Sequence, residues 1–305
     1  MDKIKVAVIG AGRLGVIHAR IYKEIPRTEL TGICDIDRLR ADSAARTFGV
    51  AAYYGHQELF GKVDAVSIAV PTELHYKIGR DFLNSNIHTL IEKPFTINVR
   101  QADSLIKTAK HKKLILQVGH VERFNSVFAA TRQIIKEAKF IECHRLSPFP
   151  NRSLDVGVVL DLMIHDIDIV LGLVNSGIKH IEAVGVKVLT KFEDIANARI
   201  TFKNGCVANL TASRISDEVM RKIRIFQKNT YISLDYKDAQ ASVYKKEASQ
   251  IIKQDLPIEK EQPLQKELAA FIDCIITKKE PLVSGEVARE ALAVALKIQK
   301  QIWRR

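Results

Sequence analysis

Short apolar runs alternate with helical patterns over residues 1–120 of the chain. Continuous apolar runs are typical of strands buried on both faces, as in a parallel sheet covered by helices. The segments between them carry apolar residues at helical spacing and end near glycine or proline. We expect strands over residues 4–9, 30–34, 65–70, 89–91 and 114–118, and helices over residues 14–25, 38–48, 75–84 and 99–111. This alternation predicts an α/β domain with a doubly wound parallel sheet.

Residues 121–305 follow a different pattern. Helices are expected over residues 123–138 and 158–173, and strands without crossover helices come after them. Asn204-Gly205 separates two such strands, and this dipeptide is the strongest short hairpin signal. Lys228-Asn229 separates a second pair, and helices over residues 264–277 and 287–303 end the chain. The pattern therefore predicts a second, α+β domain with a large, mainly antiparallel open sheet.

A glycine-rich turn joins the first predicted strand to the first predicted helix. It reads Gly10-Ala11-Gly12-Arg13-Leu14-Gly15. In a dinucleotide-binding turn, Gly10 would permit the tight bend, Gly12 the close approach of a pyrophosphate, and Gly15 the packing of helix on sheet. The free amides and the positive helix end would then hold the phosphates. Because the strand and helix flank it correctly, the turn predicts a Rossmann domain.

Asp35 ends the second predicted strand, 20 positions after Gly15. A carboxylate there accepts hydrogen bonds from ribose hydroxyls and repels a 2′-phosphate, which favours NAD. Arg38 and Arg40 follow directly and can offset part of this repulsion. NADP is therefore disfavoured, but it stays open.

Two further clusters follow strands of the same sheet, where ligands of open α/β sheets bind. The first is Val70-Pro71-Thr72, with His75 one helical turn later, and we expect Thr72 and His75 beside the nicotinamide. A purely structural His75 at the helix start is the alternative. The second is Glu92-Lys93-Pro94, whose lysine can hydrogen-bond a substrate hydroxyl and help to move its proton. Without the glycine turn, Lys93 would be an ordinary surface lysine.

Asp161 and His165 are four residues apart and share one face of a predicted apolar helix. A buried acid and a buried histidine are costly unless they are paired or used. Oxidation of an alcohol needs a base near neutral pH, and histidine meets that need. The alternative is a helix cap or buried salt bridge, which we expect for Asp166 and Asp168.

Together these residues resemble the glucose–fructose oxidoreductase, inositol dehydrogenase and MocA-like family. The resemblance spans the chain and includes Val8 to Gly12, Pro71-Thr72 with His75, Glu92-Lys93-Pro94, Gly119-His120 with Arg123-Phe124-Asn125, Asp161 with His165-Asp166-Ile167-Asp168, the Phe202 to Gly205 hairpin and the Leu268 to Phe271 helix. It implies hydride transfer between a sugar or cyclitol CH–OH carbon and C4 of nicotinamide. It also implies a cis Lys93–Pro94 bond and a homodimer or homotetramer formed through the C-terminal sheet.

The resemblance also implies roles for the site residues. His165 would be the base, Lys93 would position the hydroxyl, and Asp161 would orient the substrate. The implied cofactor contacts are Gly10, Ala11, Gly12, Arg13, Leu14, Asp35, Arg40, Val70, Pro71, Thr72, His75, Glu92, Lys93 and Pro94. The implied substrate contacts are Arg123, Asn125, Arg145, Arg152, Asp161 and His165.

The stretch from Arg145 to Asp166 is similar to the branch of this family that oxidises the 3-hydroxyl of UDP-N-acetylglucosamine. Arg145 and Arg152 suit the pyrophosphate of such a substrate, because guanidinium groups bind its oxygens in fork geometry. Arg145 can equally pair with a surface acid. An inositol-type dehydrogenase is the alternative enzyme, and a non-catalytic NAD sensor is the alternative from another class.

The net charge of +12 agrees with an anionic substrate or with a lysine-rich surface. Nucleic acid is not expected as a partner, since the basic clusters lack interleaved aromatics. The four cysteines are far apart, so we expect no metal site and free thiols in a reducing cytoplasm. The apolar stretch 156–174 carries several ionisable residues, which argues against a membrane span.

Overall fold

The structure, a computed structural model, describes residues 3–149, 155–259 and 261–304. The chain divides into two compact units. The first holds the described residues up to His120 together with Leu264–Arg289, and the second holds Val121–Pro263 with the described residues from Glu290 onward. We keep residues 1–120 and 121–305 as a proposal for the domain organisation, and each unit is described by itself.

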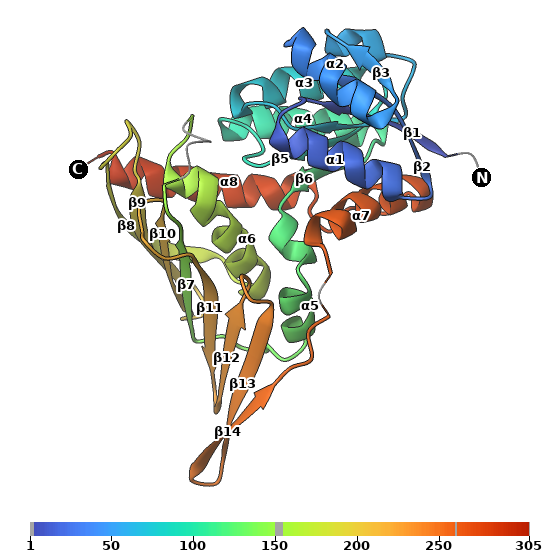
Figure 1. The fold of residues 1–305 in the computed structure, drawn as a ribbon. Helices are drawn as coiled ribbons and strands as arrows, with labels where there is room; N and C mark the ends of the chain where they lie inside the picture. The colour runs from blue at the N-terminus through green and yellow to red at the C-terminus, as the bar shows by residue number, and fades with distance from the viewer. Residues whose placement is uncertain (1–2, 150–154, 260, 305) are drawn as a thin grey trace. The chain divides into compact units, whose positions relative to one another are not determined.

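The first unit contains a six-stranded parallel sheet in the order β3-β2-β1-β4-β5-β6 (Figure 1). Its strands are β1 (Ile4–Ile9), β2 (Thr28–Cys34), β3 (Ala51–Tyr53), β4 (Ala65–Ile68), β5 (His88–Glu92) and β6 (Leu116–Gly119). The chain runs from β1 outward to β3 and then returns to β4 on the other side, so the order reverses between β1 and β4. The predicted doubly wound sheet is confirmed, and its switch point is where such sheets bind ligands.

Four helices connect these strands: α1 (Arg13–Glu24), α2 (Arg38–Phe48), α3 (Thr72–Asn84) and α4 (Val99–Lys112). α1 packs beside α2, and α3 packs beside α4. The bounds of α2 are those expected, because both ends are capped. The Asp37 side chain accepts from the amides of Leu39 and Arg40, and Gly49 ends the helix with a φ of +64°.

A later helix, α7 (Pro263–Thr277), completes the core of the first unit. Its Leu268 and Phe271 are fully buried in one cluster with Val6, Val8 and Ala19. Each large side chain buried in this way stabilises the fold by about 1.5–3 kcal/mol. The parallel sheet therefore depends on a segment far along the chain.

The second unit contains an eight-stranded sheet in the order β14-β13-β12-β11-β7-β10-β9-β8. Its strands are β7 (Phe140–Leu146), β8 (Ile178–Val186), β9 (Ile195–Phe202), β10 (Val207–Ser213), β11 (Met220–Gln227), β12 (Thr230–Asp235), β13 (Gln240–Glu247) and β14 (Gln250–Asp255). Among the strands that the structure describes in this sheet, only β7 and β10 pair in parallel, so the predicted mainly antiparallel sheet is confirmed. α5 (Ser126–Arg132) packs on β12 and β13, and α6 (Ile164–Leu173) packs on β7 and β10 (Figure 1).

Both expected hairpins form. β11 and β12 are joined through Lys228-Asn229, with Asn229 at a φ of +56°. The Asn204-Gly205 loop is one residue longer than the two-residue turn expected, because Phe202 and Cys206 are the last hydrogen-bonded pair. Gly205 takes a φ of +87°, as the left-handed position of a three-residue hairpin loop requires.

Two of the expected helices differ from the structure. Residues 123–138 do not form one helix. A 3₁₀ turn over Val121–Phe124 comes first, and the side chain of Asn125 then caps the separate helix α5. Residues 158–173 begin with a π-helical turn over Val159–Met163, and α6 follows it. π-helical turns often lie at functional sites, and this one carries Asp161. The last helix, α8 (Gly285–Ile302), closely follows the expected range.

Candidate active site

The glycine turn has the geometry that a pyrophosphate site needs. Gly10 has a φ of +100°, and a Cβ there would collide with the Ala69 carbonyl. A Cβ on Gly15 would collide with the Gly10 carbonyl, so α1 packs closer than any other residue would allow. Among the described residues, nothing lies within 4 Å of the Cβ position of Gly12. The turn is therefore closely packed at Gly10 and Gly15, and it leaves open space at Gly12, before the start of α1, where phosphates bind.

Asp35 connects this turn to the end of β2. Its Oδ2 accepts from the amide of Ala11 at 2.7 Å, and its Oδ1 accepts from the amide of Asp37 at 2.9 Å. The carboxylate is thereby fixed beside the glycine turn, which suits a contact to ribose hydroxyls. Arg40 lies in the first turn of α2 and pairs with Asp37 at 3.1 Å.

His75 holds together the two segments expected beside the nicotinamide. Its Nδ1 lies 2.9 Å from the carbonyl of Pro94, and its Nε2 lies 2.9 Å from the carbonyl of Val70. Burial lowers the pKa of His75, although the two carbonyl contacts oppose that shift. The ring therefore fixes the backbone after β4 relative to the backbone after β5. Thr72 is also buried, at the first position of α3.

Lys93 follows β5 directly and is half-buried, and the Lys93–Pro94 bond is cis, as expected. The glycine turn, Asp35, Val70 and Lys93 all follow strands of one parallel sheet. The carboxyl ends of these strands lie on one side of the sheet, so the structure brings these predicted cofactor residues to the side where the switch point lies.

The second unit holds the other two predicted catalytic residues. Asp161 is buried in the π-helical turn, and His165 is half-buried in the first turn of α6. Glu193 supports this turn, because its Oε1 accepts from the amide of Val159 at 3.3 Å. A Cβ on Gly157 would collide with the same carboxylate, so the start of the turn packs tightly against Glu193.

Arg145 lies in the interior of the second unit. Its guanidinium donates to both oxygens of Asp166 and, at 2.9 Å, to Oε1 of Glu122. All three side chains are at most 9% exposed. Burial alone would lower the pKa of Arg145, but the two carboxylates outweigh it and raise that pKa above its usual range. The partners of Arg145 are therefore two buried acids, not the surface acid of the alternative interpretation, and they occupy its guanidinium.

Arg123 and Asn125 are engaged within the protein as well. Arg123 donates from Nε to Oδ2 of Asp168 at 2.6 Å, with both side chains buried. Asn125 caps α5 and donates to Glu122 at 3.2 Å. We assign both residues to the support of the second unit. Arg152, the remaining predicted substrate arginine, lies outside the described residues.

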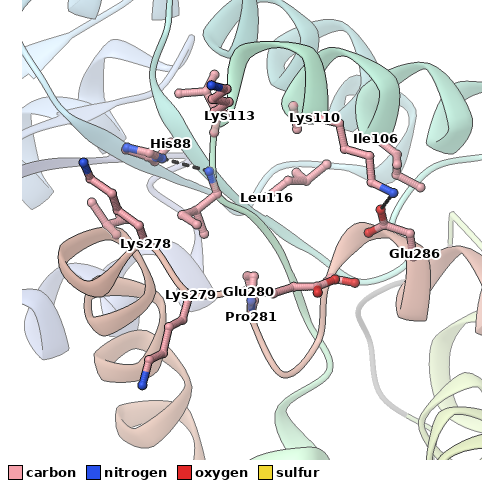
Figure 2. Close-up of a pocket in the computed structure, with 15 residues that line it drawn as sticks. His88, Ile106, Lys110, Lys113, Leu116, Lys278, Lys279, Glu280, Pro281 and Glu286 are labelled. Carbon is pink, nitrogen blue, oxygen red and sulfur yellow. Dashed lines mark hydrogen bonds and ion pairs between the residues drawn. The ribbon is translucent and has the colours of Figure 1, made fainter.

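A pocket of about 680 Å³ lies in the first unit, near the amino ends of β5 and β6. It is lined by His88 at the start of β5, by Leu116 at the start of β6, and by lysines that include Lys110, Lys113 and Lys278 (Figure 2). Because the predicted cofactor residues follow the opposite, carboxyl ends of the strands, this pocket is not the cofactor site.

The described residues show two further features that bear on function. None of their helices is long and apolar enough to cross a membrane. They also contain no group of three or more metal-ligating side chains that could hold an ion.

Comparison with known proteins then defines the family. Residues 4–120 match an oxidoreductase family with an NAD-binding Rossmann fold, and residues 117–232 match a GFO/IDH/MocA C-terminal domain. The UDP-N-acetylglucosamine 3-dehydrogenase of Acidithiobacillus ferrooxidans is 35% identical over 98% of this chain and 97% of its own. The chain belongs to the GFO/IDH/MocA oxidoreductase family. It is an NAD-binding dehydrogenase of the kind that acts on CH–OH groups, as the sequence predicts.

Solved structures agree with this assignment. The structure of the Acidithiobacillus ferrooxidans enzyme matches with a TM-score of 0.94 and covers 99% of this chain and 98% of that one. The Myo-inositol 2-dehydrogenase of Thermotoga maritima is 27% identical over 98% of this chain and 96% of its own. A scyllo-inositol dehydrogenase from Lactobacillus casei, solved with NAD(H), shares the fold at 20% identity, with a TM-score of 0.84 over 99% of this chain and 98% of that one.

Proposed function

We propose that this protein is a UDP-N-acetylglucosamine 3-dehydrogenase. The observation that carries the proposal is the 35% identity, over nearly the whole chain, to an enzyme of that name. In the reaction, the C3 hydrogen would leave as hydride, for which bound NAD would be the acceptor, and the 3-hydroxyl would lose its proton. The products are a 3-keto nucleotide sugar, NADH and a proton.

The chain's own residues supply binding and proton transfer in this proposal. The amides of the glycine turn hold the pyrophosphate of NAD, and the Asp35 carboxylate accepts from the ribose hydroxyls. Bound NAD supplies the hydride acceptor. His165 takes the hydroxyl proton, Lys93 positions that hydroxyl, and Asp161 orients the sugar. Lys93 belongs to the first unit, and His165 and Asp161 belong to the second.

The open face of the eight-stranded sheet supports a further part of the proposal, a homodimer or homotetramer. Half-buried aromatic rings stack across four strands of this face, with centroids 4.8–5.7 Å apart: Phe140, Phe226, Tyr231 and Tyr244. Along β8, Val184 and Val186 are about half exposed. Aromatic rings are enriched at interfaces between subunits.

A cytoplasmic location is proposed as well, since all four cysteines are free thiols.

The test is direct turnover with purified protein. We expect NADH to form from NAD and UDP-N-acetylglucosamine, and the His165→Ala and Lys93→Met variants to lose at least about a hundredfold in kcat. His111→Ala is the matched control, because His111 is exposed in the last turn of α4. Turnover of myo-inositol but not of the UDP-sugar would replace this substrate with the alternative. NAD binding without turnover of any sugar would favour a sensor.

A further inference from the structure

A series of buried polar side chains lies beneath Lys93, entirely within the first unit. The Tyr22 hydroxyl is 2.9 Å from Oγ of Ser67, and that Oγ is 3.1 Å from Nδ1 of His18. On the other side of the ring, Nε2 of His18 lies 3.2 Å from Oε1 of Glu92. Tyr22, Ser67 and His18 have no exposed surface, and Glu92 is 7% exposed. Buried polar groups of this kind act as a unit, since each has given up water for its neighbour.

The order of donors in this series fixes the state of His18. Burial raises the pKa of Tyr22 far above its usual range, and the charge of Glu267 on α7 adds to this rise, so Tyr22 keeps its proton and donates to Ser67. Ser67 can then donate to Nδ1 of His18. Nε2 on the other side of the ring then faces the Glu92 carboxylate and can donate to it. Every donor in the series is used once, and all of them are directed toward Glu92.

Glu92 is confined at this position. A Cβ on Gly119 of β6 would lie 2.8 Å from the carboxylate, so glycine is the residue that leaves room for it. The Glu92 Oε2 also accepts from the amide of Lys93 at 3.2 Å. Burial alone would raise the pKa of Glu92. The contact with His18 and the charge of Lys93 outweigh burial and lower that pKa, so the carboxylate stays ionised.

The series also connects three segments that carry predicted cofactor residues. His18 and Tyr22 lie on α1, which begins at the glycine turn. Ser67 lies on β4, which leads to Val70, and Glu92 ends β5 directly before Lys93. In general, a carboxylate near an amine favours the ammonium form. The Glu92 carboxylate also accepts from the backbone amide of Lys93, which fixes the backbone from which the lysine extends.

We propose that His18 is a positioning residue for Lys93, which it supports by holding the Glu92 carboxylate in place. The catalytic consequence rests on the function proposed above, whereas the link from His18 to Lys93 does not. The family resemblance implies that Glu92 contacts the cofactor. In this proposal Glu92 acts from the interior instead.

The first experiment measures the amine of Lys93 without substrate or cofactor. Purified wild-type, His18→Leu, His18→Gln and Glu92→Gln proteins are acylated with acetic anhydride at graded pH, and the Lys93 peptide is quantified by mass spectrometry. We expect the acylation midpoint of Lys93 to move by about one pH unit to lower pH in His18→Leu and Glu92→Gln. His18→Gln should restore the wild-type midpoint, because its amide can both accept from Ser67 and donate to Glu92. Exposed Lys77 on α3 is the internal control and should not move.

The second experiment measures turnover and cofactor affinity. In His18→Leu and Glu92→Gln, kcat should fall about tenfold with a shifted pH profile, while the Kd for NAD stays within about twofold. The double variant should be no worse than either single one, since both act through one carboxylate. An unchanged Lys93 midpoint in folded His18→Leu and Glu92→Gln would overturn the proposal and leave His18 with only a structural role. Loss of the proposed function would show differently, as a wild-type protein without turnover whose Lys93 midpoint still responds to His18.

Discussion

Replacement of Arg145 by methionine separates the two roles that this residue was given. The sequence predicts a substrate ligand, whereas the structure buries the guanidinium between Asp166 and Glu122. Methionine keeps the apolar stem and removes the charge, so two buried carboxylates lose their cation. Breaking a buried ion pair in this way costs about 3–5 kcal/mol, because an uncompensated charge remains.

The expected loss of stability corresponds to a fall in the melting temperature, Tm. The second unit has about 160 residues, and for a unit of this size 1 kcal/mol lowers Tm by about 2–4 °C. Arg145→Met should therefore lower the Tm of this unit by about 6–20 °C. Arg224→Met is the matched control on β11, since its side chain is 43% exposed and its pair with Glu142 spans 3.4 Å. Such a surface pair is worth about 0–1 kcal/mol, so the control should melt within a few degrees of the wild type.

Thermal unfolding by circular dichroism and steady-state kinetics would be measured on the same preparations. The expected result is a large loss of Tm with a KM for the UDP-sugar within about threefold of wild type below the transition. An Arg145→Met protein that melts like the wild type but has a KM raised tenfold or more would refute the structural role. The guanidinium would then have to reach the substrate during turnover.

Three other predictions follow from single residues. Gly15→Ala should weaken NAD binding by about tenfold or more in a fluorescence titration, because its Cβ collides with the Gly10 carbonyl and α1 must move; unchanged affinity would show that the turn does not hold NAD. His88 accepts from the Ile115 amide through Nδ1 at 2.9 Å (Figure 2), and burial lowers its pKa below 6.5. The stabilising effect of neutral His88 is therefore complete above pH 6.5, and it is lost as pH falls through the pKa of the folded protein. The Tm of His88→Asn should therefore fall less steeply with decreasing pH than the Tm of the wild type. Equal slopes of Tm against pH would reject this account. Tyr231→Lys, in the aromatic stack, should reduce the mass measured by light scattering to that of a monomer, whereas Lys237→Glu in an exposed turn should not; an oligomer that survives Tyr231→Lys does not use this face.

The parallel sheet was predictable because its signals are local. Continuous apolar runs, a capping Asp37 and a terminating Gly49 each determine a short piece of chain without help from distant residues. The antiparallel sheet was harder. β7 alternates buried and half-buried positions but carries Arg145 on its buried side, which disguises the apolar period. β14 is exposed along its whole length and has no apolar pattern to find.

The site residues divide in the same way. Gly10, Asp35 and Lys93 could be identified because each directly follows a recognisable strand. His18 was missed, since its partner Glu92 is 74 positions away and the pair forms only when α1 packs on the sheet. One signal was present: His18 and Tyr22 are four apart on a helix face that is otherwise apolar. Polar residues at helical spacing on a buried face indicate a distant partner, even when the sequence does not reveal which one.

Buried charge has the same consequence in both units. An apolar replacement of Arg145 with its two acids could be equally stable, so these ion pairs are not explained by stability alone. These ion pairs also restrict the orientation of α6, because Asp166 follows His165 on α6 and Glu122 lies in the turn before α5. A guanidinium that must satisfy both carboxylates allows few orientations of α6, whereas apolar side chains would allow many. Glu92 does the same for Lys93, through His18. In each unit, a proposed catalytic residue therefore lies next in sequence to a buried carboxylate, and the partner of that carboxylate determines how accurately the catalytic side chain is held.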